Sequence, residues 1–295
     1  MMKKGILCCI LAAVGFGTAP SVLKFLIEQG MTETNCILLS NLFLCAAAAC
    51  VCRAKGLSLR LGAARTVKLC LTGLMGMGCT TLLLASSFRY ISVGTGTVIH
   101  FLYPTVVTVG SMVLLHKKGT LFSALAIVLS IAGMACISLP GGAAGGGALG
   151  YVLALLSSFT YSFYILGNEL FRLGELPLPV TITYMSGVSA AVFLLYALAT
   201  GSIALPASLP LWLIQLGYAV IIGFSFTMLN AGIAQVGAVK ASFSTLVEPV
   251  TSVLCSVLFF GDKLTLLSLA GFVLVFASVG LNSATPKGRK VKHEV

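Results

Sequence analysis

Apolar residues along this chain fall into ten long runs, which short polar segments separate. Each run is close to the roughly 20 residues that an α-helix needs to cross a bilayer. The alternation typical of a membrane β-barrel is absent, and an open sheet could not satisfy its backbone in lipid. The pattern predicts an all-α integral membrane protein with ten transmembrane helices. They cover residues 5–27, 34–52, 68–88, 94–115, 120–139, 148–167, 178–199, 210–231, 238–260 and 264–283.

The sequence also repeats itself about 145 residues along the chain. The matched pairs include Gly5 with Gly150, Phe16 with Tyr161, Pro104 with Pro249, and Ser111 with Ser256. Each copy holds five spans, an odd number, so the second copy enters the membrane from the opposite side and the two form inverted repeats. The predicted organisation is a first five-helix repeat over 1–139, a Gly-rich linker over 140–147, a second five-helix repeat over 148–283 and a basic tail over 284–295.

Composition supports a membrane protein, because 58% of the residues are hydrophobic and only 8% are charged. A soluble domain carries about 25% charged residues. The net charge of +11 could suggest nucleic acid, but the charges lie in the gaps between apolar runs rather than on one face. We therefore expect a lipid bilayer and no nucleic acid as partners.

The positive charges predict the orientation of the spans. With the N-terminus in the cytoplasm, 15 of the 18 Lys and Arg residues lie on the cytoplasmic side, and only Lys24, Arg89 and Lys263 lie outside. Both termini are then cytoplasmic and the linker is external. No Asn-x-Ser/Thr sequon occurs, which favours a bacterial cell membrane.

The ten cysteines predict neither a metal site nor a disulfide framework. Most lie inside spans, and no Cys-x-x-Cys pair or neighbouring histidine suggests metal ligands. We interpret them as small apolar packing residues. No cofactor is expected either, since the phosphate-binding loop of ATPases and the common hydrolase motifs are missing.

Glu248 is the outstanding charged residue, about eight residues into the ninth span. A carboxylate at that depth costs several kcal/mol unless it faces a wet cavity, finds a partner or takes up a proton. Pro249 follows it and is expected to kink the helix, as is Pro104 in the fourth span. Such a site suits substrate or proton binding. The alternative is a protonated, structural glutamate bonded to the backbone that the proline leaves free or to a neighbouring helix.

The other candidate substrate or coupling residues are aromatic or polar side chains inside spans. In the first repeat, Tyr103 replaces Glu248 and His100 falls on Thr245. His100 could titrate near neutrality, or it could be a neutral histidine bonded to a facing helix. At repeat-related positions, aromatic and hydroxyl residues can line a pocket for an amphipathic solute, although packing roles remain open. This set comprises Phe16, Thr18, Tyr161, Tyr164 and Asn230.

Ten spans in two repeats, with short loops, resemble the EamA family of the drug/metabolite transporter superfamily. The local marks are Gly94-Thr95-Gly96-Thr97 before Tyr103-Pro104, and Ala241-Ser242 before Glu248-Pro249. Gly261-Asp262-Lys263-Leu264 keeps the polar turn before the last span, where the first repeat has His116-Lys117-Lys118-Gly119. The resemblance covers nearly the whole chain and implies a secondary permease, with the first four spans of each repeat around a cavity.

We therefore expect a secondary active transporter of small metabolites, such as amino acids or drug-like solutes, that works by alternating access. It is not expected to be an enzyme. An uncoupled facilitative carrier is the close alternative. A membrane enzyme acting on lipid-linked substrates would need several polar groups at one depth, and a channel would need a filter or a ring of charge.

Overall fold

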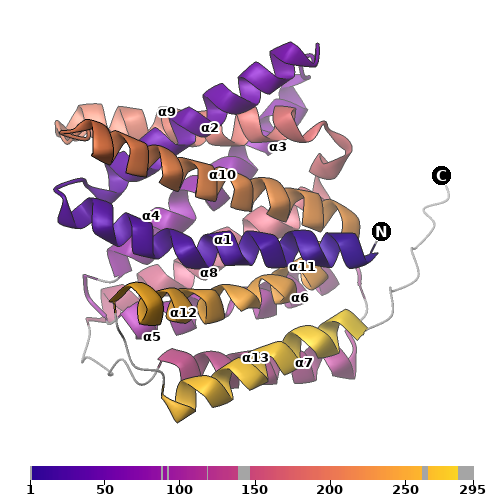
Figure 1. Ribbon diagram of the computed structural model, residues 1–295. Helices are drawn as coiled ribbons and strands as arrows, with labels where there is room; N and C mark the ends of the chain where they lie inside the picture. Colours follow the sequence, from indigo (N-terminus) through magenta and orange to yellow (C-terminus); the bar gives the residue numbers. More distant parts are fainter. Residues whose placement is uncertain are drawn as a thin grey trace, which may run out of the picture.

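The computed structural model describes residues 2–87, 89–91, 93–117, 119–138, 147–260 and 265–284. Within these ranges the chain is helical, and no strand is formed (Figure 1). The first repeat contains α1 (Met2–Glu28), α2 (Glu33–Ala54), α3 (Ala63–Gly73), the π-helical segment η1 (Leu74–Cys79), α4 (Thr80–Ser87), α5 (Val93–His100), α6 (Tyr103–Leu114) and α7 (Leu121–Ser138). The second contains α8 (Ala148–Leu170), the short η3 (Leu173–Glu175), α9 (Leu178–Thr200), α10 (Leu209–Val236), α11 (Ala238–Ser244), η4 (Thr245–Val247), α12 (Glu248–Phe260) and α13 (Leu266–Ala284).

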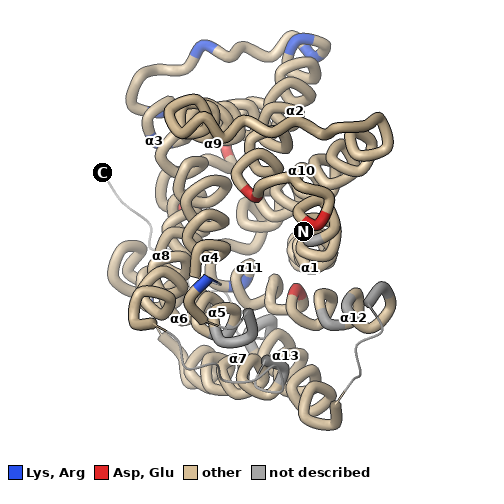
Figure 2. The backbone as a smooth tube through the Cα atoms, turned by 90° about the vertical axis from the view of Figure 1, so that its left-hand side faces the viewer, with Lys and Arg blue, Asp and Glu red and all other residues tan. Residues whose placement is uncertain are grey.

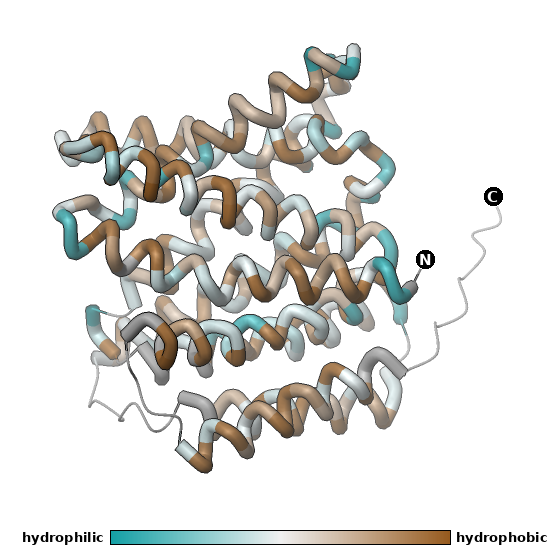
Figure 3. The backbone as a smooth tube through the Cα atoms, viewed as in Figure 1, coloured by the Kyte–Doolittle hydropathy of each residue, from teal (hydrophilic) through white to brown (hydrophobic). Residues whose placement is uncertain are grey.

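All ten predicted spans are mainly helical in their described parts, which confirms an all-helical membrane protein. Six helical stretches are long and apolar enough to cross a membrane, and shorter apolar helices complete the set. Figure 3 shows hydrophobic residues along the helices and hydrophilic ones mainly toward their ends. Figure 2 shows that few positions along the described chain are Lys, Arg, Asp or Glu. Most of the linker 140–147, nearly all of the tail 284–295 and the turn 261–264 lie outside the described residues.

Two predicted boundaries are wrong, for identifiable reasons. The third span begins at Ala63 rather than 68, because Arg65 and Lys68 lie in the first turns of α3. The eighth span continues to Val236 rather than 231. Asn230 and Gln235 interrupt the apolar run there, but their amides donate to carbonyls four residues earlier at 2.7 and 3.1 Å, so they fit within the helix.

The fourth and ninth spans are each broken where the sequence predicts only a kink. A turn at Phe101–Leu102 separates α5 from α6, and the 3-10 segment η4 separates α11 from α12. The new helices begin at Tyr103 and Glu248, so Pro104 and Pro249 stand in their first turns. A proline is tolerated there because the first amides of a helix have no partner within it. The breaks fall at matching places in the two repeats.

Helices of one repeat pack chiefly against helices of the other. The principal pairs are α1 with α10, α4 with α8, α2 with α9, and α7 with α13 (Figure 1). Many close contacts occur twice, with the repeats exchanging roles. They include Gly15–Ser225 with Thr160–Thr80, Gly17–Glu248 with Ser162–Tyr103, and Gly133–Gly271 with Ser278–Ala126. The core is therefore an interface between the two repeats of one chain.

Candidate functional site

A central cavity of about 210 Å³ lies between the two repeats. Seven of the ten spans supply its walls, four from the first repeat and three from the second, and α1, α2, η1 and α4 form the larger share. The lining residues are Phe16, Ala19, Pro20, Leu23, Ile37, Ser40, Asn41, Gly76, Met77, Thr80, Thr81, Leu84, Ala85, His100, Tyr161, Tyr218, Ile222, Phe226 and Glu248. Four of the predicted site residues are thus brought together: Phe16, His100, Tyr161 and Glu248.

Glu248 is the only ionisable carboxylate in the described lining of this cavity. It is the first residue of α12, directly after the η4 break, and it is partly buried. Within the described part of the chain it forms no ion pair. The helix α1 lies tightly against it, because a Cβ placed on Gly17 would come within 2.5 Å of the Glu248 carbonyl oxygen. Glu248 therefore projects from a broken helix held firmly by a neighbour.

Aromatic rings surround much of the cavity. Phe16 and Phe226 meet edge to face with their centroids 4.9 Å apart, so they join α1 to α10. Tyr161 of α8 lies 5.5 Å from the ring of His100. His100 Nδ1 is 3.0 Å from the Ser157 hydroxyl, also on α8. The histidine is thus bonded to a facing helix, as one of the two interpretations predicted, and it lines the cavity as well.

Polar residues of α2 and α4, which the sequence analysis missed, complete the lining. Asn41 donates to the Ile37 carbonyl at 2.9 Å, and its own Oδ1 has no partner among the described groups. Ser40 accepts a hydrogen bond of 3.0 Å from Gln215 of α10. Thr80 contacts Thr160 across the repeats at 2.9 Å. Asn41 could have been recognised from the sequence as a lining residue, because an unpaired amide in the middle of an apolar run is costly unless it meets a partner or a solute.

Tyr103, Thr245 and Thr18 do not line the central cavity. Tyr103 is fully buried, and its hydroxyl lies 2.8 Å from that of Thr245, so it ties the start of α6 to the η4 break. Thr18 donates to the Gly15 carbonyl of its own helix at 2.9 Å. The structure gives these three residues packing and helix-positioning contacts instead.

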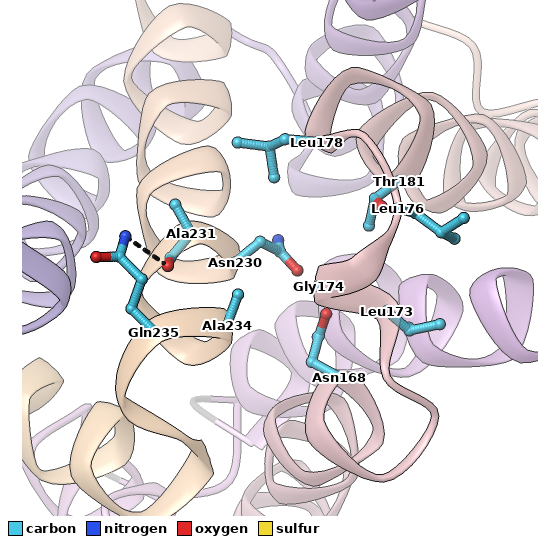
Figure 4. Close-up of a pocket in the computed structure, with 10 residues that line it drawn as sticks. All are labelled: Asn168, Leu173, Gly174, Leu176, Leu178, Thr181, Asn230, Ala231, Ala234 and Gln235. Atoms are coloured by element: carbon cyan, nitrogen blue, oxygen red, sulfur yellow. Dashed lines mark hydrogen bonds between the residues drawn. The ribbon is translucent and has the colours of Figure 1, made fainter. Parts of the chain in front are cut away.

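Tyr164 and Asn230, the last two predicted site residues, are buried beside the cavity and bonded to each other. The Asn230 amide donates to the Tyr164 hydroxyl at 2.6 Å. Asn230 also lines a second cavity, of about 230 Å³, near the end of α10 (Figure 4). That cavity is lined by Asn168, Leu173, Gly174, Leu176, Leu178, Thr181, Asn230, Ala231, Ala234 and Gln235.

The lining of the central cavity offers groups that can bind a small solute. No described Lys or Arg lines it, so it offers no ready partner for a phosphate or carboxylate group. Among the described residues, no group of three His, Cys, Asp or Glu could hold a metal ion. What the lining offers is one carboxyl group, hydrogen-bonding side chains and aromatic faces, which suit a small amphipathic solute or a proton.

The comparisons with known proteins point the same way. The model of the EamA-like transporter family matches residues 3–139 and again residues 148–284. A solved crystal structure of a protein superposes with a TM-score of 0.82, covering 96% of this chain and 99% of its own, at 16% sequence identity. At that identity it shows a shared fold alone. No curated protein matches the sequence.

Proposed function

Since the chain belongs to the EamA-like transporter family, we propose that it is a secondary active transporter that moves small metabolites across the cytoplasmic membrane by alternating access. The observation that carries the proposal is the position of Glu248. It lies in a cavity between two repeats, at a break in a helix. Cavities of this kind, at discontinuous helices near the repeat interface, are where transporters built from repeats bind their solutes.

The exchange of contacts between the repeats supports an inverted arrangement. Gly17 meets the Glu248 carbonyl, and its counterpart Ser162 donates to the Tyr103 carbonyl at 3.2 Å. Partners exchange in this way when two units are related by an approximate two-fold axis. In such a protein the repeats can swap conformations, so that the cavity faces each side in turn. Amino acids and drug-like solutes are the proposed substrate class.

In this proposal Glu248 binds the solute or a coupling proton. The lining offers it no described cation, so a proton or an ammonium-bearing solute would serve as its partner. The two access states would give the carboxyl different surroundings and so different proton affinities. That difference is what couples the movement of a proton to the movement of a solute.

Transport without ATP tests the proposed function. We expect purified protein in liposomes to take up radiolabelled solutes from a panel of amino acids and small amines, with saturation and with counterflow from preloaded vesicles. A carrier shows both because one site serves both sides. Thermal stabilisation by panel compounds selects the solutes to be labelled. Uptake that never saturates, with no counterflow, would instead indicate a channel.

The proposed orientation makes a separate prediction. Reporter domains fused within 141–147 and after Lys292 should report opposite sides of the membrane, the second being cytoplasmic. The reason is the division of Lys and Arg between the two sides of the ten spans. Compartment-specific reporter enzymes in whole cells provide the measurement. Both reporters active on the same side would contradict an inverted five-helix repeat.

A further inference from the structure

Tyr164 lines neither cavity but contacts residues that line both. The tyrosine is fully buried, and its ring stacks on Tyr161 at 6.0 Å and meets Phe226 edge to face at 5.6 Å. Both of those rings line the central cavity. On the other side, the Tyr164 hydroxyl accepts the hydrogen bond from Asn230, which lines the second cavity. Tyr164 is therefore packed between residues of the two linings.

The packing leaves Tyr164 little room to move while its hydrogen bond is intact. A Cβ on Gly76, in the π-helical η1, would come within 2.3 Å of the tyrosine ring. Asn230 is held in turn, since its amide also donates to the Phe226 carbonyl at 2.7 Å. Segments of π-helix are often found at functional sites. Here the π-helical η1 packs directly against the Tyr164 ring and so restricts its movement.

Comparison of the two repeats shows which residues replace Tyr164 and Asn230 at the matching positions. At the offset of about 145 residues, Tyr164 corresponds to Ala19 and Asn230 to Ala85. Both alanines line the central cavity. The large bonded pair in one repeat thus occupies the place that two small residues leave open in the other.

The second cavity likewise corresponds, under the repeat, to part of the central cavity. Its residues Asn168 and Asn230 correspond to Leu23 and Ala85, which line the central cavity toward the end of α1. The second cavity lies at the opposite end of the bundle, where Gly5 near the start of α1 packs against Gln235. The two spaces therefore correspond under the repeat and reach toward opposite ends of the bundle, with Tyr164 packed between residues of the two linings.

We propose that the second cavity is the cytoplasmic vestibule and second solute site of the transport path, and that the Tyr164–Asn230 hydrogen bond is the latch of the gate between it and the central cavity. This inference rests on the proposed transport function. When the latch releases, the vestibule joins the centre and the solute can pass.

The vestibule is built for a solute that donates hydrogen bonds. Asn230 Oδ1 and Thr181 Oγ1 are buried and have no partner among the described groups. Figure 4 shows the amide ends of Asn168 and Asn230 directed toward the same part of the cavity, near Gly174. No Asp, Glu, Lys, Arg or His lines this space in the described chain. Ammonium, amide or hydroxyl groups of a small solute fit these two oxygen atoms, and no described cation lines the space to neutralise an anion.

Thiol labelling from the two sides of the membrane tests the latch. The reporter is Leu84→Cys, in the wall of the central cavity, and the probe is a membrane-impermeant maleimide added to right-side-out or inside-out vesicles. Mass spectrometry of the labelled peptide separates it from the ten native cysteines. With the latch intact, labelling from the external side is expected to be faster. Tyr164→Phe keeps the ring and removes the bond, so the ratio of cytoplasmic to external labelling should rise about two- to tenfold, as the loss of one hydrogen bond allows.

A second variant and a matched control decide the result. Asn230→Ala should raise the same ratio, and the double variant should raise it no further than either single one, because one bond is lost in each case. Tyr184→Phe removes a tyrosine hydrogen bond to the Leu59 carbonyl, neither residue lining a cavity, and should leave the ratio unchanged. The thermal unfolding midpoint of each variant in detergent verifies that it is folded.

The outcomes separate the latch from the transport proposal. An unchanged labelling ratio in Tyr164→Phe and Asn230→Ala, in a reporter that is labelled from both sides, overturns the latch and leaves alternating access standing. Strictly additive shifts in the double variant also overturn it. Labelling from the external side alone, in every variant and with solute present, overturns alternating access itself.

Discussion

Replacing Glu248 with glutamine is expected to lower transport about tenfold or more and to flatten its dependence on pH. The substitution keeps the size of the side chain and most of its hydrogen-bonding capacity, but it removes titration and negative charge. Hydrogen bonds to a charged group contribute about 1.5–3 kcal/mol, which corresponds to tenfold or more in an equilibrium constant. Because no other Asp or Glu lines the cavity in the described chain, no other described group there can replace the carboxylate as the partner of a cation or a proton.

Initial uptake rates in proteoliposomes, measured between about pH 5 and 8, provide the readout. Glu175→Gln is the matched control, because that glutamate is exposed at the surface and 3.6 Å from Arg65. Exposed pairs contribute little, so the control should keep both its rate and its pH profile. If Glu248→Gln transports at the unaltered rate with the unaltered profile, Glu248 is a structural residue, and an uncoupled facilitative carrier becomes the better account of the protein.

The fold could be predicted from the sequence because lipid leaves few alternatives. Apolar runs must be helical, and their number and spacing can be counted. The breaks at Phe101–Leu102 and η4 were anticipated only as kinks, although Pro104 and Pro249 marked the places. A proline shows that the regular hydrogen bonding is interrupted, but whether the helix bends or restarts depends on its neighbours. The π-helical η1 has no such mark in the sequence.

The site was only partly predictable, because helical position alone does not tell which face meets which neighbour. Glu248, His100, Phe16 and Tyr161 were identified by charge or by the repeat, and the structure places them in one cavity. Tyr103 was identified by the same reasoning, yet it is fully buried elsewhere. A buried hydroxyl satisfied by a neighbour and one that lines a cavity look alike in sequence. Only the packing of the two repeats distinguishes them.

The contact between α1 and α12 is expected to tolerate no side chain at Gly17. A Cβ there would come within 2.5 Å of the Glu248 carbonyl oxygen and 2.7 Å of the Thr251 Cβ. Backbone atoms cannot give way as a flexible side chain can, so Gly17→Val must push α1 from α12. Overpacking of this kind costs typically 1–3 kcal/mol, and more where backbone must move. For a protein of this size that lowers the unfolding midpoint by roughly 2–5 °C.

Gly217→Val is the matched control, since a Cβ at that position in α10 meets nothing within 4 Å. Both positions are helical glycines, and valine changes helix propensity similarly at each, so the difference between the variants isolates packing. Thermal unfolding in detergent should leave the control near the unaltered midpoint, with Gly17→Val well below it. Transport by Gly17→Val should also fall at temperatures below its unfolding midpoint, where the variant is folded. The reason is that the contact at Gly17 positions Glu248, the first residue of α12. Equal midpoints for the two variants would mean that α1 does not lie against Glu248 as closely as described. The position of the Glu248 carboxyl group in the cavity would then not be fixed by α1.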